Sequence, residues 1–262
     1  MEESTMISPL SISSVYIEMM YNEEIIGKGT AFYYREDGKL YLISNWHNFS
    51  GRNPDTGKPI HSALAIPNRI KVYSHKVVDN SVEQQIDFHK LENDEGEALW
   101  FEHGSLGRKV DVGALPIELN YEVIDINEAI AEIDPYSNYQ TKIGEKLFVL
   151  GFPFGISVSN NLPIWKSASV ASEPEIDCDS LPLFYIDTAT REGMSGSPVV
   201  MYKDRAVSLI TKDKGKIDSH TQLVGVYSGR IVPKDLIEVQ LGKVWKVKCI
   251  QDVIHGNTYI DA

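Results

Sequence analysis

Short runs of β-branched and aromatic residues, each ended by a turn signal, limit the fold of this chain more than any other feature. The stretch "SSVYIEMMYNEEIIGKGTAFYYREDGKLYLISNWH" predicts three strands joined at "YNEE" and "REDGK", and Asp-Gly is a strong hairpin signal. Further strands are predicted at "RIKVYSH", "EQQIDFH", "KVDVGALPIE", "EKLFVLGFP", "IWKSASVAS", "LFYIDTA", "SPVVMY", "AVSLIT" and "TQLVGVYS". About a dozen strands at irregular spacing predict β-barrels or a sandwich.

Helical signals are few. We expect a turn after His47 and a C-terminal helix that begins at Pro233, because proline suits the first helical position. The polar segment 120–145, which contains Pro135, is the best candidate for a crossover between two halves. Two barrels of about 120 residues each, with a cleft between them, fit this layout.

Charge and hydropathy exclude several function classes. The net charge of −12 and pI near 5.0 argue against a surface for phosphates, so nucleic acid is not an expected partner. No apolar run approaches the roughly 20 residues that span a bilayer, so we expect no membrane association. The N-terminus lacks the basic segment and apolar core of a secretory signal. We expect a cytoplasmic protein, or a chain that begins after processing.

The cysteines and acidic clusters give no sign of a metal site. Cys178 and Cys249 could form one bridge, but two reduced thiols fit a cytosolic protein equally well. No Cys/His group has the spacing of zinc ligands. The acidic stretch "LENDEGE" (91–97) lacks the register of a calcium loop and is interpreted as a solvated turn. Neither a metal nor another cofactor is expected.

The run "TREGMSGSPVV" (190–200) places small residues directly before a β-branched pair. Glycine loses more backbone freedom on folding than any other residue, so ordering this run is unfavourable. It is either a tight connection between two strands or a rigid turn. Such a turn would aim the Ser195 hydroxyl outward and point successive backbone N–H groups at one spot.

A serine nucleophile needs a base to accept its proton and a third group to orient that base. Among seven histidines, His47 directly follows the apolar strand "LYLISNW" at the point where the chain must turn. Asp111 begins "DVGALPI", and a buried carboxylate there requires a partner, unless it only caps a loop. Asp87, in "QQIDFH", is a weaker competitor.

With "LISNWHNF", "DVGALPI", "LGFPFG" and "GMSGSPVV" in this order, the chain resembles the chymotrypsin-fold, trypsin-like serine proteases. The resemblance runs from "GKGTAFYY" to "VGVYSG" and is closest to the bacterial branch without disulfides, with some likeness to glutamyl endopeptidases. It implies one peptidase unit over 1–262, built from two six-stranded antiparallel Greek-key barrels. Residues 10–125 would form the first barrel, and 126–262 the second barrel with the C-terminal helix.

The resemblance also implies roles for the candidate residues. Ser195 would attack the scissile carbonyl, while His47 would take its proton and later protonate the leaving amine. Asp111 would orient the imidazole and stabilise its charged form. The backbone N–H groups of Gly193 and Ser195 would form the oxyanion hole. Ser228 would border Asp111 and begin the strand that pairs with the backbone of a polypeptide substrate.

The residues expected to bind substrate come from two short stretches. They are Ala189, Thr190, Tyr227, Ser228, Gly229 and Arg230. Ala189 carries no charge, so a preference for Lys or Arg before the scissile bond is not expected. Thr190 matches a threonine of the glutamyl enzymes, but Tyr227 stands where they have histidine, and Arg230 is interpreted as a solvated strand-end residue. A small or medium uncharged side chain is the expected preference.

The sequence departs from this family at several positions. Met194 replaces the aspartate that pairs with a new N-terminal amine in zymogen-activated enzymes, and no matching mature N-terminus is present, so that activation is not expected. Asn45 and Trp46 replace the usual Ala-Ala before the histidine. The alternatives are a catalytically silent binding module and a protease that an activating protein partner switches on.

An α/β-hydrolase is a further alternative, but its nucleophile motif G-x-S-x-G would need glycine at Ser197. It would also need helices that alternate with strands, and Asp235 and His255 would have to complete the triad. The strand-rich pattern argues against this fold.

Overall fold

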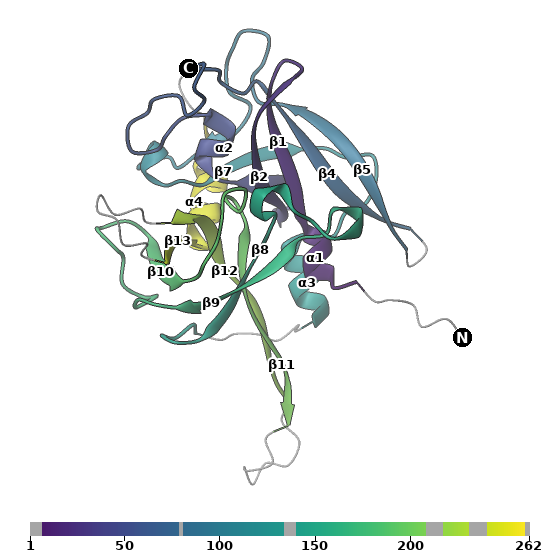
Figure 1. Ribbon diagram of the computed structural model, residues 1–262, viewed down its shortest axis with the longest axis vertical. Helices are drawn as coiled ribbons and strands as arrows, with labels where there is room; N and C mark the ends of the chain where they lie inside the picture. The colour runs from purple at the N-terminus through teal and green to yellow at the C-terminus, as the bar shows by residue number, and fades with distance from the viewer. Residues whose placement is uncertain (1–6, 79–80, 134–139, 208–216, 231–239, 260–262) are drawn as a thin grey trace.

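The computed structural model describes residues 7–78, 81–133, 140–207, 217–230 and 240–259. Within these residues the chain is mostly β and forms two units that pack side by side, as Figure 1 shows. The predicted all-β, chymotrypsin-like class is confirmed. The expected hairpin across Asp37 and Gly38 is also confirmed, with the register running to the pair Glu36 and Lys39.

The first unit is an eight-stranded sheet in the order β14-β6-β7-β3-β2-β1-β4-β5. Its strands are β1 (Ser14–Tyr21), β2 (Glu24–Glu36), β3 (Lys39–Ser44), β4 (Arg69–Val78), β5 (Ser81–Lys90), β6 (Phe101–Glu102), β7 (Gly113–Ile117) and β14 (Thr258–Tyr259). Neighbouring pairs along the order from β14 to β5 are antiparallel. The sheet has two strands more than the expected six, and one of the two is β14, from the C-terminal end of the chain, which returns to pair with β6.

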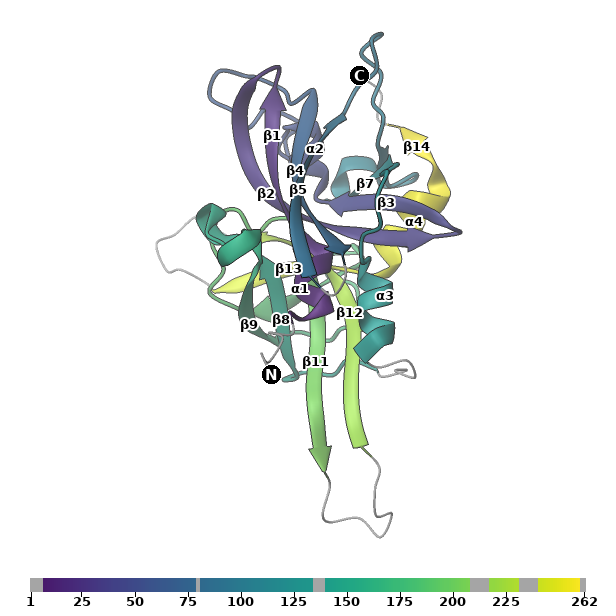
Figure 2. The same cartoon turned by 90° about the vertical axis from the view of Figure 1, so that its right-hand side faces the viewer.

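The second unit is a closed six-stranded barrel in the order β10-β13-β12-β11-β8-β9, as expected. Its strands are β8 (Lys146–Gly151), β9 (Ile164–Val170), β10 (Leu183–Asp187), β11 (Pro198–Val207), β12 (Ile217–Arg230) and β13 (Leu241–Lys246). In Figure 2, β11 and β12 continue beyond the barrel as a two-stranded ribbon. The first two residues of the predicted strand "AVSLIT", Ala206 and Val207, belong to β11, and its other residues lie outside the described ranges.

The helices differ from the sequence expectation. They are α1 (Pro9–Ser13), α2 (Trp46–Ser50), α3 (Ile126–Ile133) and α4 (Lys248–Gly256), with short 3-10 turns η1 (Gly107–Lys109), η2 (Pro153–Gly155) and η3 (Ser159–Asn161). The turn after His47 is present as α2. The expected C-terminal helix is present as α4, but it begins at Lys248. Its predicted start, Pro233, lies outside the described residues, and residues 241–246 form β13 because "LGKVWK" pairs with β10 and β12.

Three apolar clusters hold the molecule together. One fills the first unit around Ile17, Tyr33 and Leu42, and one fills the barrel around Val149 and Val199. The third lies between the units and combines residues of both with the buried face of α4. Burial of apolar surface is the main favourable term in folding, so this shared cluster fixes one unit against the other. The active-site candidates lie along this junction.

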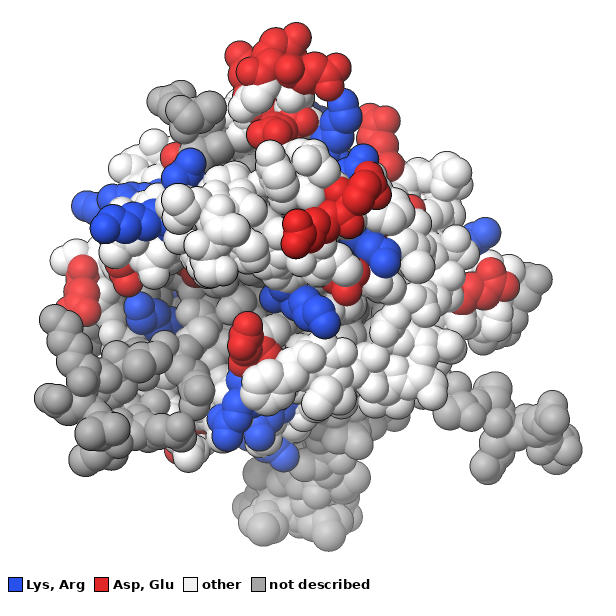
Figure 3. Space-filling model, turned by 45° about the horizontal axis from the view of Figure 1, so that its top comes forward, with Lys and Arg blue, Asp and Glu red and all other residues white. Residues whose placement is uncertain are grey.

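Two further observations describe the surface and the thiols. On the face in Figure 3, basic side chains are interspersed with acidic ones rather than gathered into one patch. No helix in the described ranges is long and apolar enough to cross a membrane. Cys178 and Cys249 are free thiols, so the bridge left open by the sequence is not formed.

Candidate active site

Four candidate side chains from distant parts of the chain meet at the junction of the two units. His47 lies in α2, directly after β3, and Asp111 lies between η1 and β7. Ser195 lies in the loop that joins β10 to β11, and Ser228 lies near the end of β12. The first two therefore come from the first sheet and the last two from the barrel.

The Asp111 carboxylate binds His47 twice. Its Oδ2 lies 2.8 Å from the imidazole Nδ1, and its Oδ1 accepts the His47 backbone N–H at 2.9 Å. The Ser228 hydroxyl donates a third hydrogen bond to Oδ2. His47 is in the first turn of a short helix, where backbone N–H groups have no intrahelical acceptor, so its N–H is free to reach Asp111. This arrangement leaves Nε2 as the ring nitrogen available for a proton.

Burial and charge act in opposite directions on this pair. Burial disfavours the charged imidazolium, but the charge of Asp111 and its hydrogen bond outweigh burial, so the pKa of His47 lies above its ordinary value. Burial would raise the pKa of Asp111, which is 3% exposed. The charge of His47 and three donated hydrogen bonds hold the pKa of Asp111 below its ordinary value. Asp111 is therefore the ionised partner.

The backbone around Asp111 is held by its buried sequence neighbours and by the residues that precede His47. Its neighbours Val110 and Val112 are fully buried in the cluster between the units. The side-chain amide of Asn45 donates to the Asp111 carbonyl oxygen at 2.7 Å. The indole N–H of Trp46 donates to Glu102 Oε2 at 2.7 Å. The unusual residues before His47 therefore hold the aspartate loop and the end of β6 in place.

The backbone carbonyl of Ser195 is held by the first sheet. Its oxygen accepts the Thr30 N–H at 2.9 Å and the Asn48 side-chain amide at 3.1 Å. Gly196 N–H donates to the Tyr227 carbonyl at 2.9 Å within the barrel. A Cβ at Gly196 would overlap the Thr30 carbonyl oxygen and the Ser44 hydroxyl. Only glycine allows the serine loop to approach β2 this closely.

Gly193 is packed against the turn that follows β8. Its φ is +91°, and a Cβ there would overlap the Phe152 carbonyl oxygen. The preceding carbonyl, that of Glu192, accepts the Phe154 N–H at 2.7 Å. The C=O and N–H of a planar trans peptide point in opposite directions, so the Gly193 N–H faces away from this turn. In the described part of the chain, the N–H groups of Gly193 and Ser195 donate no hydrogen bond.

The Ser195 hydroxyl makes no hydrogen bond to any residue that the structure describes, His47 included. Both side chains line the same two cavities. Catalytic hydrogen bonds are commonly long in substrate-free enzymes and shorten when substrate binds. The two side chains therefore line the same cavities without a hydrogen bond between them.

The structure places the six residues expected to bind substrate in different surroundings. Ser228 and Gly229 line a cavity with Ser195. Thr190 and Tyr227 are buried and hydrogen-bonded to each other through their hydroxyls. Ala189 is half-buried beside them, and Arg230 ends β12 with a side chain outside the described set.

Sequence reasoning did not identify Thr30, Asn48 or Phe154 as supports for the serine loop. Thr30 and Asn48 are buried polar residues, and buried polar groups are expected to be hydrogen-bonded. The asparagine just after His47 in "NWHN" was the available signal. Thr30 contacts the loop through its backbone N–H, which donates to the Ser195 carbonyl, and through its hydroxyl, which donates to the Gly193 carbonyl at 2.8 Å. Phe154 contacts the loop through its backbone N–H, and no local sequence pattern marks any of these contacts.

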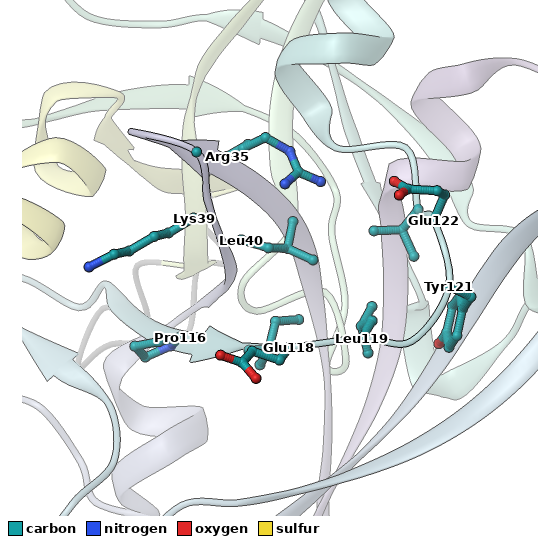
Figure 4. A pocket seen from close by; sticks show the side chains of 11 residues that line it. Arg35, Lys39, Leu40, Pro116, Glu118, Leu119, Tyr121 and Glu122 are labelled. Atoms are coloured by element: carbon teal, nitrogen blue, oxygen red, sulfur yellow. The ribbon is translucent and has the colours of Figure 1, made fainter.

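A larger cavity of about 690 Å³ lies elsewhere, between β3 and the segment that follows β7 (Figure 4). Leu40 and Leu119 form part of its apolar wall, while Arg35, Glu118 and Glu122 carry charges. It shares no lining residue with the two cavities beside Ser195 and contains neither serine nor histidine.

In the described ranges, no group of three His, Cys, Asp or Glu residues could hold a metal ion.

Comparison with one solved structure agrees with the fold. A serine endoprotease from Yersinia pestis is 15% identical, with 94% of this chain and 62% of that chain covered and a TM-score of 0.51. Inactive forms of the Rv3671c protease are also similar. One, from M. tuberculosis H37Rv, is a mutant that is 16% identical over 97% of this chain and 92% of that chain, with a TM-score of 0.46. Another has 16% identity, coverages of 97% and 95%, and a TM-score of 0.43.

The fold is that of a chymotrypsin-like protease. The trypsin-like peptidase domain family matches residues 29–209, which contain His47, Asp111 and Ser195. The chain belongs to this family. No curated protein sequence matches it.

Proposed function

We propose that this protein is a serine endopeptidase that cleaves polypeptides through His47, Asp111 and Ser195 and an acyl-enzyme intermediate. One observation carries the proposal: the buried Asp111 carboxylate orients His47 through Nδ1, while His47 and Ser195 line the same cavities. Belonging to a peptidase family supports it independently.

In the proposed mechanism, Nε2 of His47 accepts the Ser195 proton as Oγ attacks the scissile carbonyl. The charge of Asp111 stabilises the imidazolium that results. The N–H groups of Gly193 and Ser195 bind the oxyanion, and the backbone contacts of Glu192 and Gly196 hold these donors in place. His47 then protonates the leaving amine, and water hydrolyses the ester through the same steps in reverse.

The preference for the residue before the scissile bond stays a prediction. The predicted positions Ala189, Thr190 and Tyr227 carry no charge, which supports a small or medium uncharged side chain there. Activation through a new N-terminal amine is not part of the proposal, because Met194 offers no carboxylate to that amine.

The test is labelling of the purified protein with a fluorophosphonate probe, read by intact mass. We expect one adduct on the wild type and none on Ser195→Ala or His47→Ala. Matched controls are Ser105→Ala and His255→Ala, which change an exposed residue of the same type outside the site. An adduct that survives Ser195→Ala would refute the assignment of the nucleophile.

Among the described residues none accepts a hydrogen bond from Ser195 Oγ, which favours one second candidate, a protease-like binding module that is catalytically silent or is activated by a protein partner. The same labelling separates the two. An adduct that forms only after cell extract is added identifies a partner-activated protease. No adduct under either condition identifies a binding module.

A further inference from the structure

Two cavities of similar size meet at the candidate nucleophile. One has a volume of about 260 Å³ and the other about 280 Å³, and Ser195, His47 and Ile60 line both. The second includes Ser228 and Gly229 at the end of β12. The first includes Gly193 but no residue of β12. A peptide that passes over Ser195 would therefore contact a different cavity on each side of its scissile bond.

The chemistry of the site assigns a direction to this peptide. In the proposed function, the acyl half of the substrate pairs with the end of β12 by strand addition. An extended chain advances about 3.3 Å per residue in one direction, so the leaving half continues away from β12. The cavity without β12 residues is then the one that receives the leaving half. We call it the leaving-side cavity.

The leaving-side cavity borders the apolar cluster of the first unit, because Met19 and Ile26 belong to or pack against that cluster and also line the cavity. Val15, Ile17 and Met19 point to the same side of β1, and Met19 is the last of them. Ile26 packs against this cluster from β2. A Cβ on Gly27 would lie 2.8 Å from the Met19 methyl carbon, so glycine at this position leaves room for that methyl group.

The outer wall of the cavity comes from the loop between α2 and β4. Ile60, Ala65 and Pro67 line it. Ile60 is held by a hydrogen bond of 2.9 Å from its N–H to the Gly51 carbonyl, yet its side chain is 56% exposed. An apolar ligand that covers it would gain about 25 cal/mol per Å² of apolar surface removed from water.

Charge does not select the ligand of this cavity. Lys28 and Glu192 line it and are exposed charges of opposite sign. The cavity across Ser195 has more charged residues in its lining, namely Lys109, Lys243, Asp55 and Asp111. Drug-sized ligands occupy pockets of roughly 300–1,000 Å³, so the leaving-side cavity suits one side chain.

We infer that the leaving-side cavity selects a large apolar side chain at the residue directly after the scissile bond. The inference rests on the proposed function and adds a substrate class to it. Specificity then depends on Met19, Ile26 and Ile60, whereas Thr190 and Tyr227 concern the residue before the bond.

Acyl transfer measures this selection separately from the acyl half. The wild type is acylated with an alanine-ended peptide methyl ester and offered water together with an amino-acid amide. The amine nitrogen attacks the acyl carbonyl and its proton passes to His47. The bond to Ser195 Oγ breaks, the serine recovers that proton, and a new peptide bond forms. Chromatography gives the ratio of peptide to hydrolysed acid.

We expect leucinamide and phenylalaninamide to partition about tenfold better than glycinamide, which lacks the side chain that the cavity would bury. Aspartamide should partition no better than glycinamide. Ile60→Asp should remove the preference for leucinamide. Ile143→Asp is the matched control, because Ile143 is 53% exposed and lines neither cavity, and it should keep the preference.

A second measurement does not depend on turnover. The chain has 6 methionines, and Met19 is the one that lines the leaving-side cavity, so ¹³C-methyl labelling gives an assignable probe. Leucinamide should shift the Met19 methyl resonance in the Ser195→Ala variant, and glycinamide should not. Equal partitioning of the amides, or no Met19 shift, overturns the inference. Failure to form any acyl-enzyme while Met19 still shifts overturns the proposed function instead.

Discussion

The two units contribute to the candidate site by different physical means. The first sheet supplies side-chain chemistry, namely His47 and Asp111, and fixes it with hydrogen bonds from polar side chains such as Asn45. The barrel supplies a backbone turn, fixed by close approach of Gly193 and Gly196 to neighbouring backbone. Charge must be held by partners in a buried site, whereas N–H donors are aimed by placing the peptide units that carry them.

Removal of the Asp111 charge, which the first sheet supplies, should lower kcat more than any other change. Asp111→Asn keeps the shape but disrupts the tautomer and orientation of His47, so we expect kcat to fall about 10⁴-fold. The variant should also change the pH profile. His47 works as the neutral base, so activity is lost as pH falls through its pKa, and Asp111 raises that pKa. The acid limb should therefore move to lower pH in the variant.

The pH dependence of fluorophosphonate labelling checks this shift. Asp87→Asn is the matched control, since Asp87 was the weaker candidate and contacts Ser74 and Tyr121 instead. An acid limb that stays in place in Asp111→Asn would mean that the carboxylate does not set the His47 pKa.

A disturbed backbone turn on the barrel side should have the next largest effect. Gly193→Ala places a Cβ against the Phe152 carbonyl oxygen, so the turn must shift and one oxyanion donor is misdirected. Loss of one such donor typically lowers kcat by about 10²–10³. The acid limb should not move, because the His47–Asp111 pair is untouched. Gly96→Ala, at another positive φ but with open space around it, controls for backbone strain alone.

Loss of the hydrogen bond from Asn48, in α2, to the Ser195 carbonyl, in the serine loop, should have the smallest effect on activity. Asn48→Ala removes one of two hydrogen bonds to the Ser195 carbonyl, and such a bond contributes about 0.5–1.5 kcal/mol. We expect a loss of that size in the free energy of unfolding and a labelling rate reduced by up to about tenfold. Asn127→Ala, which removes an exposed hydrogen bond to the Arg35 carbonyl, is the control. An unchanged labelling rate would show that the hydrogen bond from the Thr30 N–H is enough to hold the Ser195 carbonyl.

The sequence predicted the strand pattern well and the C-terminal region poorly. Alternating and β-branched runs identified β1 to β5, β7 and the barrel strands β8 to β12, because such runs favour a half-buried pleated surface. β13 was missed since Gly242 and two lysines weaken its local signal, although it pairs on both sides in the barrel. The two-residue strands β6 and β14 are too short for any periodicity.

The sequence by itself determined which groups could do chemistry. His47 after an apolar strand, Asp111 between buried valines and Ser195 among glycines are local patterns, and order along the chain connected them to a protease family. The tertiary structure alone decided what holds them. Contacts such as Asn48 to Ser195, or Phe154 to Glu192, join residues far apart in the chain. The apolar cluster between the units brings them together, and no local sequence pattern encodes such packing.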